Sequence, residues 1–463
     1  MPTAPATPRK TTQKTATRDH TVKTAILGAG VSGLSLARAL VEGGLDAADI
    51  TLFEAAPVAG GLCRSKVIDG FTYDLAGGHI LFSKQQEILD WMLTAGGGPE
   101  AFEKRQRNTA IRFEDRWVRY PFENGIGDLP DQANYECLVG YVHAWHQRKL
   151  TGSEAPADFA AWIRWRFGEG IARHFMDPYN EKIWKRPLEQ ITSEWVAGRV
   201  PDAPIEDVLR AAVGIRTEGY VHQSVFRYPK QGGFQAITDG MAADLKERIR
   251  LSTPVDRVTR KGEGWSVHGE EYDQVVLTTP LDLAAELVEG VPPDVRAAME
   301  GLEYNGLVSF LVALDTPEQP DLSWCYLPHP NQGPANRVTW MSNYSQNGAP
   351  EGRSSLLVEI TCSGREGQPE QKLEETTLLG LENAGLLTRG QVLFTDRSDV
   401  KRAYVVYVHG HETRRRKALE WLEGQGLVPL GRFGRFEYDN SDQCVEKAQC
   451  LAKRLLRADN LPA

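Results

Sequence analysis

The sequence lacks the features that mark several large classes of protein. Its six cysteines are scattered and form no CxxC pair, so neither a zinc knuckle nor a redox dithiol is indicated, and a reducing, cytoplasmic setting is expected. No stretch approaches the roughly 18 apolar residues needed to cross a bilayer. The 53 Lys and Arg are outnumbered by 62 Asp and Glu, for a formal charge of −9. We therefore expect no nucleic-acid partner, no membrane partner and no metal site.

Length and the first residues set the domain plan. A chain of 463 residues with 41% hydrophobic content predicts two or three domains around a sizeable core. Residues 1–20, "MPTAPATPRKTTQKTATRDH", contain no apolar core of the kind found in a secretory signal. We expect this stretch to be a disordered tail.

The first ordered segment carries a glycine-rich turn. In "TVKTAILGAGVSGLSLARAL" an apolar strand pattern is followed by the glycine turn 28–33 and then by a helical pattern. Such glycines let backbone N–H groups approach a diphosphate at the helix N-terminus. A second strand ends on an acid placed to accept from ribose hydroxyls. The predicted dinucleotide contacts are Gly28, Gly30, Val31, Ser32, Gly33 and Glu54.

The next motif favours FAD over NAD. The segment "EAAPVAGGLCRS" resembles the extended FAD signature of glutathione-reductase-like and amine-oxidase-like flavoproteins. The alternating pattern from 251 to 281, with a hairpin at 262–264, and the strand, glycine turn and helix from 427 to 455 resemble further pieces of that domain. The resemblance implies FAD contacts at Gly61, Leu62, Arg64, Val255, Arg432, Asp442 and Gln443.

Seven later segments, taken in order, resemble the FAD-dependent UDP-galactopyranose mutases, especially the longer eukaryotic-type forms and their bacterial relatives. The similarity covers nearly the whole chain after residue 20. The segments are "DLAGGHILFS" (74–83), "RYPFENGI" (119–126), the stretch 167–201, "FRYPKQGGF" (226–234), the stretch 324–345, "RAYVVY" (402–407) and "GRFGRFEYDNSDQ" (431–443).

The resemblance implies roles for three catalytic candidates. Arg199 and Arg337 match the arginines that hold the substrate diphosphate, although each could be a surface or ion-paired arginine by sequence alone. His79, after Gly78, matches a histidine that lies against the flavin. It is expected to position the flavin, and the alternative is a buried histidine bonded to backbone.

Further candidates would contact the substrate. Asn180 and Trp184 stand four residues apart, on one helical face; the alternative is a core Trp and a capping Asn. In the mutases the matching pair lines the nucleotide pocket. Tyrosines and an asparagine from separate strand-like segments match groups around the sugar and diphosphate, although each tyrosine could simply belong to the core. They are Tyr326, Asn343, Tyr404 and Tyr438.

The segment "RYPFENGI" raises the question of which base is bound. Tyr120 and Phe122 match rings that cradle uracil, and Asn124 follows them. Glu123 stands where the family usually has Gln. A carboxylate only accepts hydrogen bonds, so it suits the two adjacent N–H donors of guanine better than uracil. Alternatively, Glu123 points to solvent and a neighbour reads uracil.

The resemblance implies a redox-neutral isomerisation. A nucleotide-diphosphate hexopyranose, from UDP-galactopyranose or a GDP-hexopyranose, would become a furanose through a flavin N5–sugar adduct, with FAD active when reduced. A reductant such as NAD(P)H or a reductase is implied, and a homodimer is possible. The alternative is an FAD-dependent oxidoreductase of the amine-oxidase or protoporphyrinogen-oxidase type, which shares the FAD segments.

The predicted fold class is α/β. A discontinuous, doubly wound FAD domain with a parallel sheet would carry a helical insertion and a mixed antiparallel sheet domain. The spacing of Phe159, Trp162, Ile163 and Phe167 predicts a helical apolar stripe. After the tail, the expected ranges are 21–87, 223–300 and 396–463 for the three FAD-domain parts, 88–222 for the mainly helical substrate domain and 301–395 for the sheet domain over the flavin.

Overall fold

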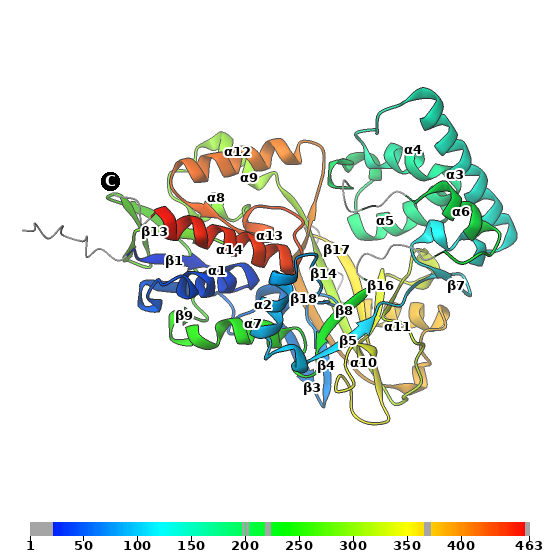
Figure 1. Ribbon diagram of the computed structural model, residues 1–463, viewed down its shortest axis with the longest axis horizontal. Coiled ribbons are helices and arrows are strands. Elements are labelled where there is room, and N and C mark those ends of the chain that lie inside the picture. The colour runs from blue at the N-terminus through cyan, green and yellow to red at the C-terminus, as the bar shows by residue number, and fades with distance from the viewer. Residues whose placement is uncertain (1–21, 197–199, 201–202, 218–223, 365–371, 459–463) are drawn as a thin grey trace, which may run out of the picture.

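A computed structural model of the protein describes residues 22–196, 200, 203–217, 224–364 and 372–458. Two β-sheets and one group of helices form its main parts (Figure 1). The expected tail, residues 1–20, and the catalytic candidate Arg199 lie outside the described residues.

A five-stranded parallel sheet forms the core of the first lobe. Its order is β19-β13-β1-β2-β9, and each neighbouring pair is parallel. Short apolar runs such as "TAIL" are buried along their whole length, as expected of strands covered on both faces. The strands are β1 (Thr24–Leu27), β2 (Ile50–Phe53), β9 (Ile249–Arg250), β13 (Gln274–Leu277) and β19 (Val428–Pro429).

Helices from distant parts of the chain cover this sheet. One hydrophobic cluster joins the sheet to α1 and α14, and a second joins it to α9 and α12. The doubly wound parallel architecture predicted from sequence is therefore confirmed. The helices are α1 (Val31–Glu42), α2 (Gln86–Ala95), α7 (Gln235–Ala242), α8 (Ala284–Leu287), α9 (Pro293–Glu300), α12 (His411–Gly424), α13 (Gly431–Gly434) and α14 (Ser441–Ala458).

Smaller antiparallel units accompany the lobe. Strands β10 and β11 form the hairpin predicted at 262–264, and β12 extends it. Strands β3 and β4 pair as a second hairpin, and β5 pairs with β8 where the chain enters and leaves the insertion. Their bounds are β3 (Ser65–Ile68), β4 (Phe71–Asp74), β5 (Phe102–Gln106), β8 (Val225–Pro229), β10 (Val258–Lys261), β11 (Gly264–Val267) and β12 (Glu270–Tyr272).

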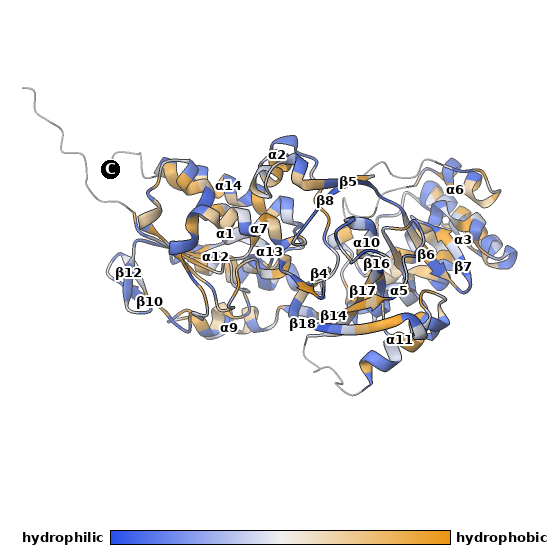
Figure 2. Ribbon diagram, turned by 90° about the horizontal axis from the view of Figure 1, so that it is seen from below, coloured by the Kyte–Doolittle hydropathy of each residue, from blue (hydrophilic) through white to orange (hydrophobic). Residues whose placement is uncertain are grey.

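A seven-stranded sheet forms the centre of the molecule, in the order β18-β14-β17-β16-β15-β6-β7. All its pairs are antiparallel except β15 with β6. Hydrophobic residues gather along β14 and β17, which are almost wholly buried (Figure 2). The elements are β6 (Thr109–Phe113), β7 (Arg116–Arg119), β14 (Glu303–Leu314), β15 (Trp324–Tyr326), β16 (Arg337–Trp340), β17 (Ser354–Ser363) and β18 (Val392–Val406), with α10 (Met341–Tyr344) and α11 (Leu373–Asn383) beside them.

The sheet crosses two of the boundaries expected from sequence. Strand β18 continues eleven residues beyond 395, because its pairing with β14 extends to Val406. Strands β6 and β7 come from the range 88–222 but hydrogen bond to this sheet through β15. Both boundaries of the sheet are therefore set by pairing between strands that are far apart in the sequence.

The insertion is otherwise helical. Its helices are α3 (Asp131–Thr151), α4 (Phe159–Ile171), α5 (Asp177–Trp184) and α6 (Ile205–Ala212). The predicted apolar stripe of α4 is buried throughout. Asp158 caps this helix by accepting from Ala161 N at 2.8 Å. A kink at Gly168 (φ 77°) brings α4 against α3, where a Cβ would lie 2.1 Å from Gly140 O.

Candidate active site

The glycine turn after β1 leaves the N-terminus of α1 open. Gly28 has a φ of 109°, and a Cβ there would lie 2.3 Å from Thr278 Oγ1. A Cβ at Gly33 would lie 2.0 Å from Gly28 O, so the helix packs directly on the turn. The N-cap, Gly30, provides no side-chain cap, and the first turn has no acidic residue. Backbone N–H groups in this arrangement suit a diphosphate.

Glu54 ties the two βα turns of the sheet together. Its Oε2 accepts from Ala29 N at 2.8 Å, and its Oε1 accepts from Ala56 N at 2.9 Å. A carboxylate offers about four acceptor sites. Both oxygens therefore keep acceptor capacity for ribose hydroxyls while they hold the backbone.

The second glycine pair closes against the first turn. Gly60 N donates to Ala29 O at 2.8 Å, and Gly60 forms a parallel bridge with Gly30. At Gly61 (φ 57°) a Cβ would lie 3.0 Å from Gly30 Cα. Arg64 Nε donates to Gly61 O at 3.0 Å. Backbone therefore lines the approach to α1, as close contact with a dinucleotide requires.

A fully buried carboxylate, that of Asp74, organises the loop after β4. It accepts from Ser65 Oγ at 2.6 Å, Tyr228 OH at 2.9 Å, Phe234 N at 3.1 Å and His79 N at 3.1 Å. Burial alone would raise the pKa of Asp74, but the hydrogen bonds and charge of His79 and the bond from Ser65 lower it. Asp74 is therefore an ion that fixes the backbone of residues 77–79, called the Gly-Gly-His segment below.

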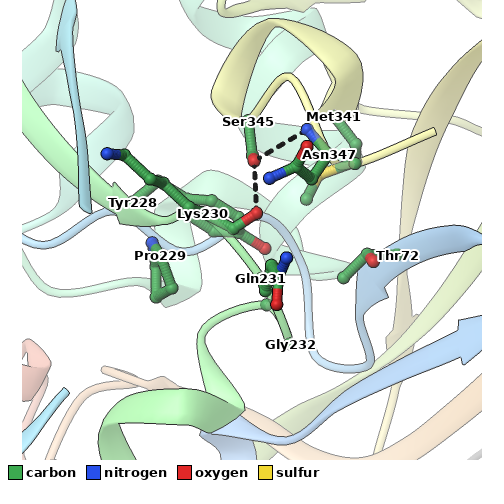
Figure 3. A pocket seen from close by; sticks show the side chains of 11 residues that line it. Thr72, Tyr228, Pro229, Lys230, Gln231, Gly232, Met341, Ser345 and Asn347 are labelled. Atoms are coloured by element: carbon green, nitrogen blue, oxygen red, sulfur yellow. Dashed lines mark hydrogen bonds between the residues drawn. The ribbon is translucent and has the colours of Figure 1, made fainter. Parts of the chain in front are cut away.

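Tyr228 also connects this network to the loop that follows β8. It lines a small hollow in which Ser345 Oγ donates to Lys230 O at 2.7 Å and Asn347 N donates to Ser345 Oγ at 3.2 Å (Figure 3). These bonds hold the 229–233 loop against the 345–348 loop. Gly233 (φ 67°) has no room for a Cβ, which would lie 2.4 Å from Ser65 Oγ.

His79 combines a fixed backbone with a partly exposed ring. Its Nδ1 is 3.8 Å from Asp74 Oδ2, and its ring centroid is 5.1 Å from that of Phe234. Burial favours the neutral imidazole, but Cys63 and Asp74 together raise the pKa of His79 above its usual value. The ring is 23% exposed, so part of it is accessible at the surface of the Gly-Gly-His segment.

Arg337 is a partly buried cation, 20% exposed, held by the same segment. Its Nε is 2.9 Å from Glu359 Oε1, and its Nη2 donates to Gly78 O at 2.5 Å. Glu359 is 1% exposed and also accepts from Gly78 N at 3.1 Å. A Cβ at Gly77 would lie 2.6 Å from Glu359 Oε2, so the ion pair needs glycine there.

Tyrosines lie on two sides of the ion pair between Arg337 and Glu359. Tyr404 and Tyr438 are stacked at 6.3 Å with 17° between their planes. Arg432 lies 4.3 Å from the Tyr438 ring and donates to Ala403 O at 2.8 Å. The predicted cofactor residue Arg432 is thus brought together with two predicted substrate tyrosines.

On the other side, Tyr326 is the cross-strand neighbour of Arg337. Its ring is 5.3 Å from that of Tyr120 and 5.1 Å from that of Tyr179. The guanidinium of Arg107 lies 5.0 Å from the Tyr120 ring. The contacts place the "RYPFENGI" segment beside β15 and β16.

The segment continues into a stack of rings. Phe122 stacks on Phe175 at 4.8 Å, and Phe175 stacks on Tyr179 at 5.2 Å. Glu123 and Asn124 are 6% and 5% exposed, so Glu123 does not point to solvent, which corrects that alternative. Asn124 Nδ2 donates to Thr217 Oγ1 at 3.2 Å, whereas its buried Oδ1 has no hydrogen-bond partner among the described residues.

Two other predicted substrate groups make internal hydrogen bonds. Trp184 Nε1 donates to Asn180 Oδ1 at 3.1 Å, and Asn180 Nδ2 donates to Met176 O at 2.7 Å. Asn343 Nδ2 donates to Pro320 O and Leu322 O. Asn343 is thus bonded to the 319–322 loop and is not joined to the tyrosines by any hydrogen bond of the described residues.

Known protein families match most of this chain. The family described as flavin-containing amine oxidoreductase matches residues 99–385, and an NAD(P)-binding Rossmann-like domain matches residues 26–93. The chain belongs to the flavin-containing amine oxidoreductase family. Its membership rests on a match that covers well over half of the sequence.

Individual members of this oxidoreductase family are distant in sequence. Coproporphyrinogen III oxidase from Mycobacterium tuberculosis is 26% identical over 63% of this chain and 66% of that protein. A flavin-containing amine oxidase from Oncorhynchus mykiss is 24% identical over 60% of this chain and 54% of that protein. The matched region thus spans less than two thirds of either relative.

Solved structures match over almost the whole chain. Reduced UDP-galactopyranose mutase superposes with a TM-score of 0.87 and 29% identity, covering 95% of this chain and 96% of that one. Putrescine oxidase bound to putrescine has a TM-score of 0.60 at 18% identity, covering 94% and 99%. The second match shows the fold alone, and the first confirms the resemblance to the mutases found in the sequence.

The cofactor of this protein is FAD, as the family match and the similarity to the mutase structure indicate. The chain fits it, because at Gly28, Gly33 and Gly61 a Cβ would lie within 3.0 Å of neighbouring protein atoms, so glycine is needed for the close backbone packing around the N-terminus of α1. Val31 and Ser32 begin that helix, Leu62 and Val255 pack against one hydrophobic cluster, and Asp442 and Gln443 begin α14. Burial raises the pKa of Asp442.

Sequence reasoning missed residues on which the site depends. They are Asp74, Arg107, Phe175, Tyr179 and Glu359. Glu359 had a visible signal, since it is the one charged residue in the strand "SSLLVEITCS". The aromatic residues had none, because only tertiary packing makes them neighbours.

The described residues contain neither a membrane-spanning helix nor a metal-binding cluster. Among the described residues, no helix combines the length and apolarity that a bilayer crossing needs. In the same part of the chain, no three His, Cys, Asp or Glu side chains are grouped to hold a metal.

The Asp74 network generates a prediction about stability. Because the folded pKa of Asp74 is lowered, its stabilisation is present above about pH 4 and is lost as the pH falls through the folded value. Asp74→Asn should lower the free energy of unfolding at pH 7 by about 2–4 kcal/mol, and the difference from wild type should shrink under acid. Urea denaturation from pH 3 to pH 8 measures this. Asp69→Asn, on the exposed β3–β4 turn, is the control; equal losses at every pH would contradict the expectation.

Proposed function

We propose that the protein is a flavin-dependent nucleotide-sugar mutase, which converts a nucleotide-diphosphate hexopyranose into its furanose isomer without net oxidation. The observation that carries the proposal is the partly buried guanidinium of Arg337, held by the buried Glu359 beside the Gly-Gly-His segment. The similarity to reduced UDP-galactopyranose mutase supports it, because that similarity extends over 95% of the chain.

Arg337 would bind the diphosphate. Its Nε and Nη2 contact Glu359 and Gly78, and Nη1 has no acceptor among the described residues. Nη1 can therefore donate to a phosphate oxygen while the other nitrogens keep the guanidinium in place. As the sugar–phosphate bond breaks, negative charge grows on the departing diphosphate, and this fixed cation stabilises it. Arg199 is proposed as the second cation.

Tyrosine hydroxyls would hold the remaining oxygens of the substrate. Tyr326, Tyr404 and Tyr438 lie on both sides of Arg337 and can donate to sugar hydroxyls or phosphate. His79 would position the flavin ring from the Gly-Gly-His segment, where its ring is partly exposed. FAD, when bound and reduced, supplies the nucleophilic centre that retains the sugar while its ring opens and recloses.

Two nucleotides remain candidates, UDP and GDP. The buried carboxylate of Glu123 and the buried Asn124 Oδ1 are both acceptors on one turn. Guanine presents adjacent N–H donors, whereas uracil presents one donor between two acceptors. The acceptors favour a GDP-hexopyranose, and the similarity to UDP-galactopyranose mutase favours UDP-galactopyranose.

An oxidase is the second candidate function. Coproporphyrinogen III oxidase and a flavin-containing amine oxidase are similar to this chain over 63% and 60% of its length. Arg337 argues against it, since a hydrophobic or amine substrate has no use for a fixed, partly exposed cation. An oxidase would consume oxygen, whereas a mutase yields an isomer.

NAD(P)H is the proposed reductant, with a reductase as the alternative. A polar cavity of about 660 Å³ lies beside the site, and Lys104, Arg105, Arg107 and Asp321 are among its lining residues. Its positive charges suit a nucleotide phosphate. The possible homodimer is a separate expectation from the sequence, and it remains a prediction.

The proposed activity has a direct test. The purified flavoprotein, reduced with dithionite or NADPH under anaerobic conditions, is incubated with UDP-, GDP- and dTDP-hexopyranoses. We expect a furanose peak by liquid chromatography and NMR with at least one nucleotide, and none with oxidised protein. Oxygen consumption with an amine or porphyrinogen and no isomer from any sugar would favour the oxidase.

Arg337 should matter for both catalysis and stability. Arg337→Ala removes the diphosphate contact, which is worth on the order of 2.7–4 kcal/mol, and should lower kcat/KM roughly 100-fold or more. It also leaves Glu359 buried without its partner, which costs about 3–5 kcal/mol, so Tm should fall. Arg337→Lys keeps the charge and should recover stability better than turnover. Near-normal turnover of the folded Ala variant would rule out the assignment.

Glu123 should set the preference for the base. Glu123→Gln supplies a donor, and should shift preference from GDP-sugar toward UDP-sugar by about tenfold or more, since one unmatched polar group costs about 1–3 kcal/mol. The ratio of kcat/KM for the two sugars measures this. Glu154→Gln, an exposed change in the same lobe, is the control. An unchanged ratio would sink the guanine hypothesis.

A further inference from the structure

Lys182 of α5 is bonded entirely to backbone carbonyls. Its Nζ donates to Leu327 O at 2.9 Å, His329 O at 2.8 Å and Ala335 O at 3.0 Å. An ammonium has three N–H donors, so all of them are used. Burial and the charge of Lys185 lower the pKa of Lys182 to about 7, whereas the three carbonyl dipoles favour the charged form. Lys182 therefore has no donor left for a substrate.

The three carbonyls belong to the connection between β15 and β16. The connection begins after Tyr326 and ends before Arg337, and these two residues face each other across the strands. Leu327 N donates to Asn336 O at 3.0 Å, which extends the ladder by one step. Lys182 thus contacts the connection immediately after Tyr326 and two residues before Arg337.

The last residues of α5 are also bonded to a second strand of the sheet. Asn305 of β14 donates through Nδ2 to Ile183 O at 2.9 Å and to Trp184 O at 2.8 Å. Tyr179, one turn before Lys182, packs edge-on against Tyr326. The helix that bears Tyr179 and Asn180 is therefore bound to two separate parts of the sheet.

We propose that Lys182 is a positioning residue. It holds the β15–β16 connection on α5, and so it fixes Arg337 and Tyr326 relative to the part of the site that is proposed to bind the nucleoside. The inference rests on the proposed function, in that Arg337 is taken as the diphosphate-binding group. Without the ammonium, three carbonyls lose their donor and the Arg337 end of β16 loses its tie to the helical lobe. Displacement of a binding group by about 1 Å can cost 100-fold.

Lys182→Met tests this, because it keeps the length of the side chain and removes every donor. Dissociation constants of UDP and GDP, and of uridine and guanosine, are measured with the intact flavoprotein by calorimetry. We expect the better-bound diphosphate to weaken about tenfold or more and its nucleoside to change less than about twofold. Lys182→Arg keeps donors and charge and should restore part of the loss. Lys149→Met, which changes an exposed lysine of α3, should behave as wild type.

A double-mutant cycle with Arg337→Ala decides whether Lys182 acts through Arg337. In the Arg337→Ala background, Lys182→Met should weaken the diphosphate by less than about twofold. Wild-type affinity in Lys182→Met, or the same loss in both backgrounds, would overturn the proposal. If the Met variant does not fold as a flavoprotein, Lys182→Gln replaces it in the same cycle.

The proposed function and the positioning role can fail separately. If wild type binds neither nucleoside diphosphate, the proposed function fails, and hydrogen exchange of the amides in 327–336 decides the role of Lys182 without a ligand. Faster exchange there in Lys182→Met, with unchanged exchange in β18, would support the tie to α5. Unchanged exchange in 327–336 would refute it.

Discussion

The pairing of Arg337 with the buried carboxylate of Glu359 is the interaction on which the rest of the site depends. The two residues face each other across β16 and β17, so the sheet itself brings the charges together. Withdrawing a charge from water is costly unless it is paired and hydrogen bonded, and here the Gly78 carbonyl completes the pairing of Arg337 with the buried Glu359. The ion pair in turn excludes any side chain at Gly77. One strand register thereby determines both the position of a cation and the path of the Gly-Gly-His segment.

Two further networks extend this constraint to the neighbouring lobes. Asp74 fixes the same segment from the FAD-binding lobe, and it does so through donors from β3, β8 and the loop before α7. From the helical lobe, Lys182 donates to Ala335 O, two residues before Arg337. Each network ends on backbone groups, which have less freedom than long side chains. A diphosphate requires charges at defined positions, and three lobes of the chain determine those positions together.

Much of the local structure could be predicted, because it depends on residues that are close in sequence. The glycine turn 28–33, the hairpin at 262–264 and the buried stripe of α4 are confirmed. The limits of the seven-stranded sheet were harder to predict from the sequence, since β18 extends to Val406 only because β14 pairs with it. Asn343 shows the same difficulty within the site: its segment resembles one that reaches substrate, yet its amide bonds to the 319–322 loop.

The sequence by itself determined the parallel FAD-binding lobe, its cofactor and the resemblance to the mutases, because glycine turns and apolar periods act over a few residues. It also identified Arg337 and the "RYPFENGI" segment as groups to consider. Only the tertiary structure decided that Arg337 is paired with Glu359, that Glu123 is buried, and that Phe175 and Tyr179 continue the stack of rings. These properties arise from strand register and helix packing between segments far apart in the chain. Burial and pairing of a charge depend on what surrounds it, and one chain segment does not specify its surroundings.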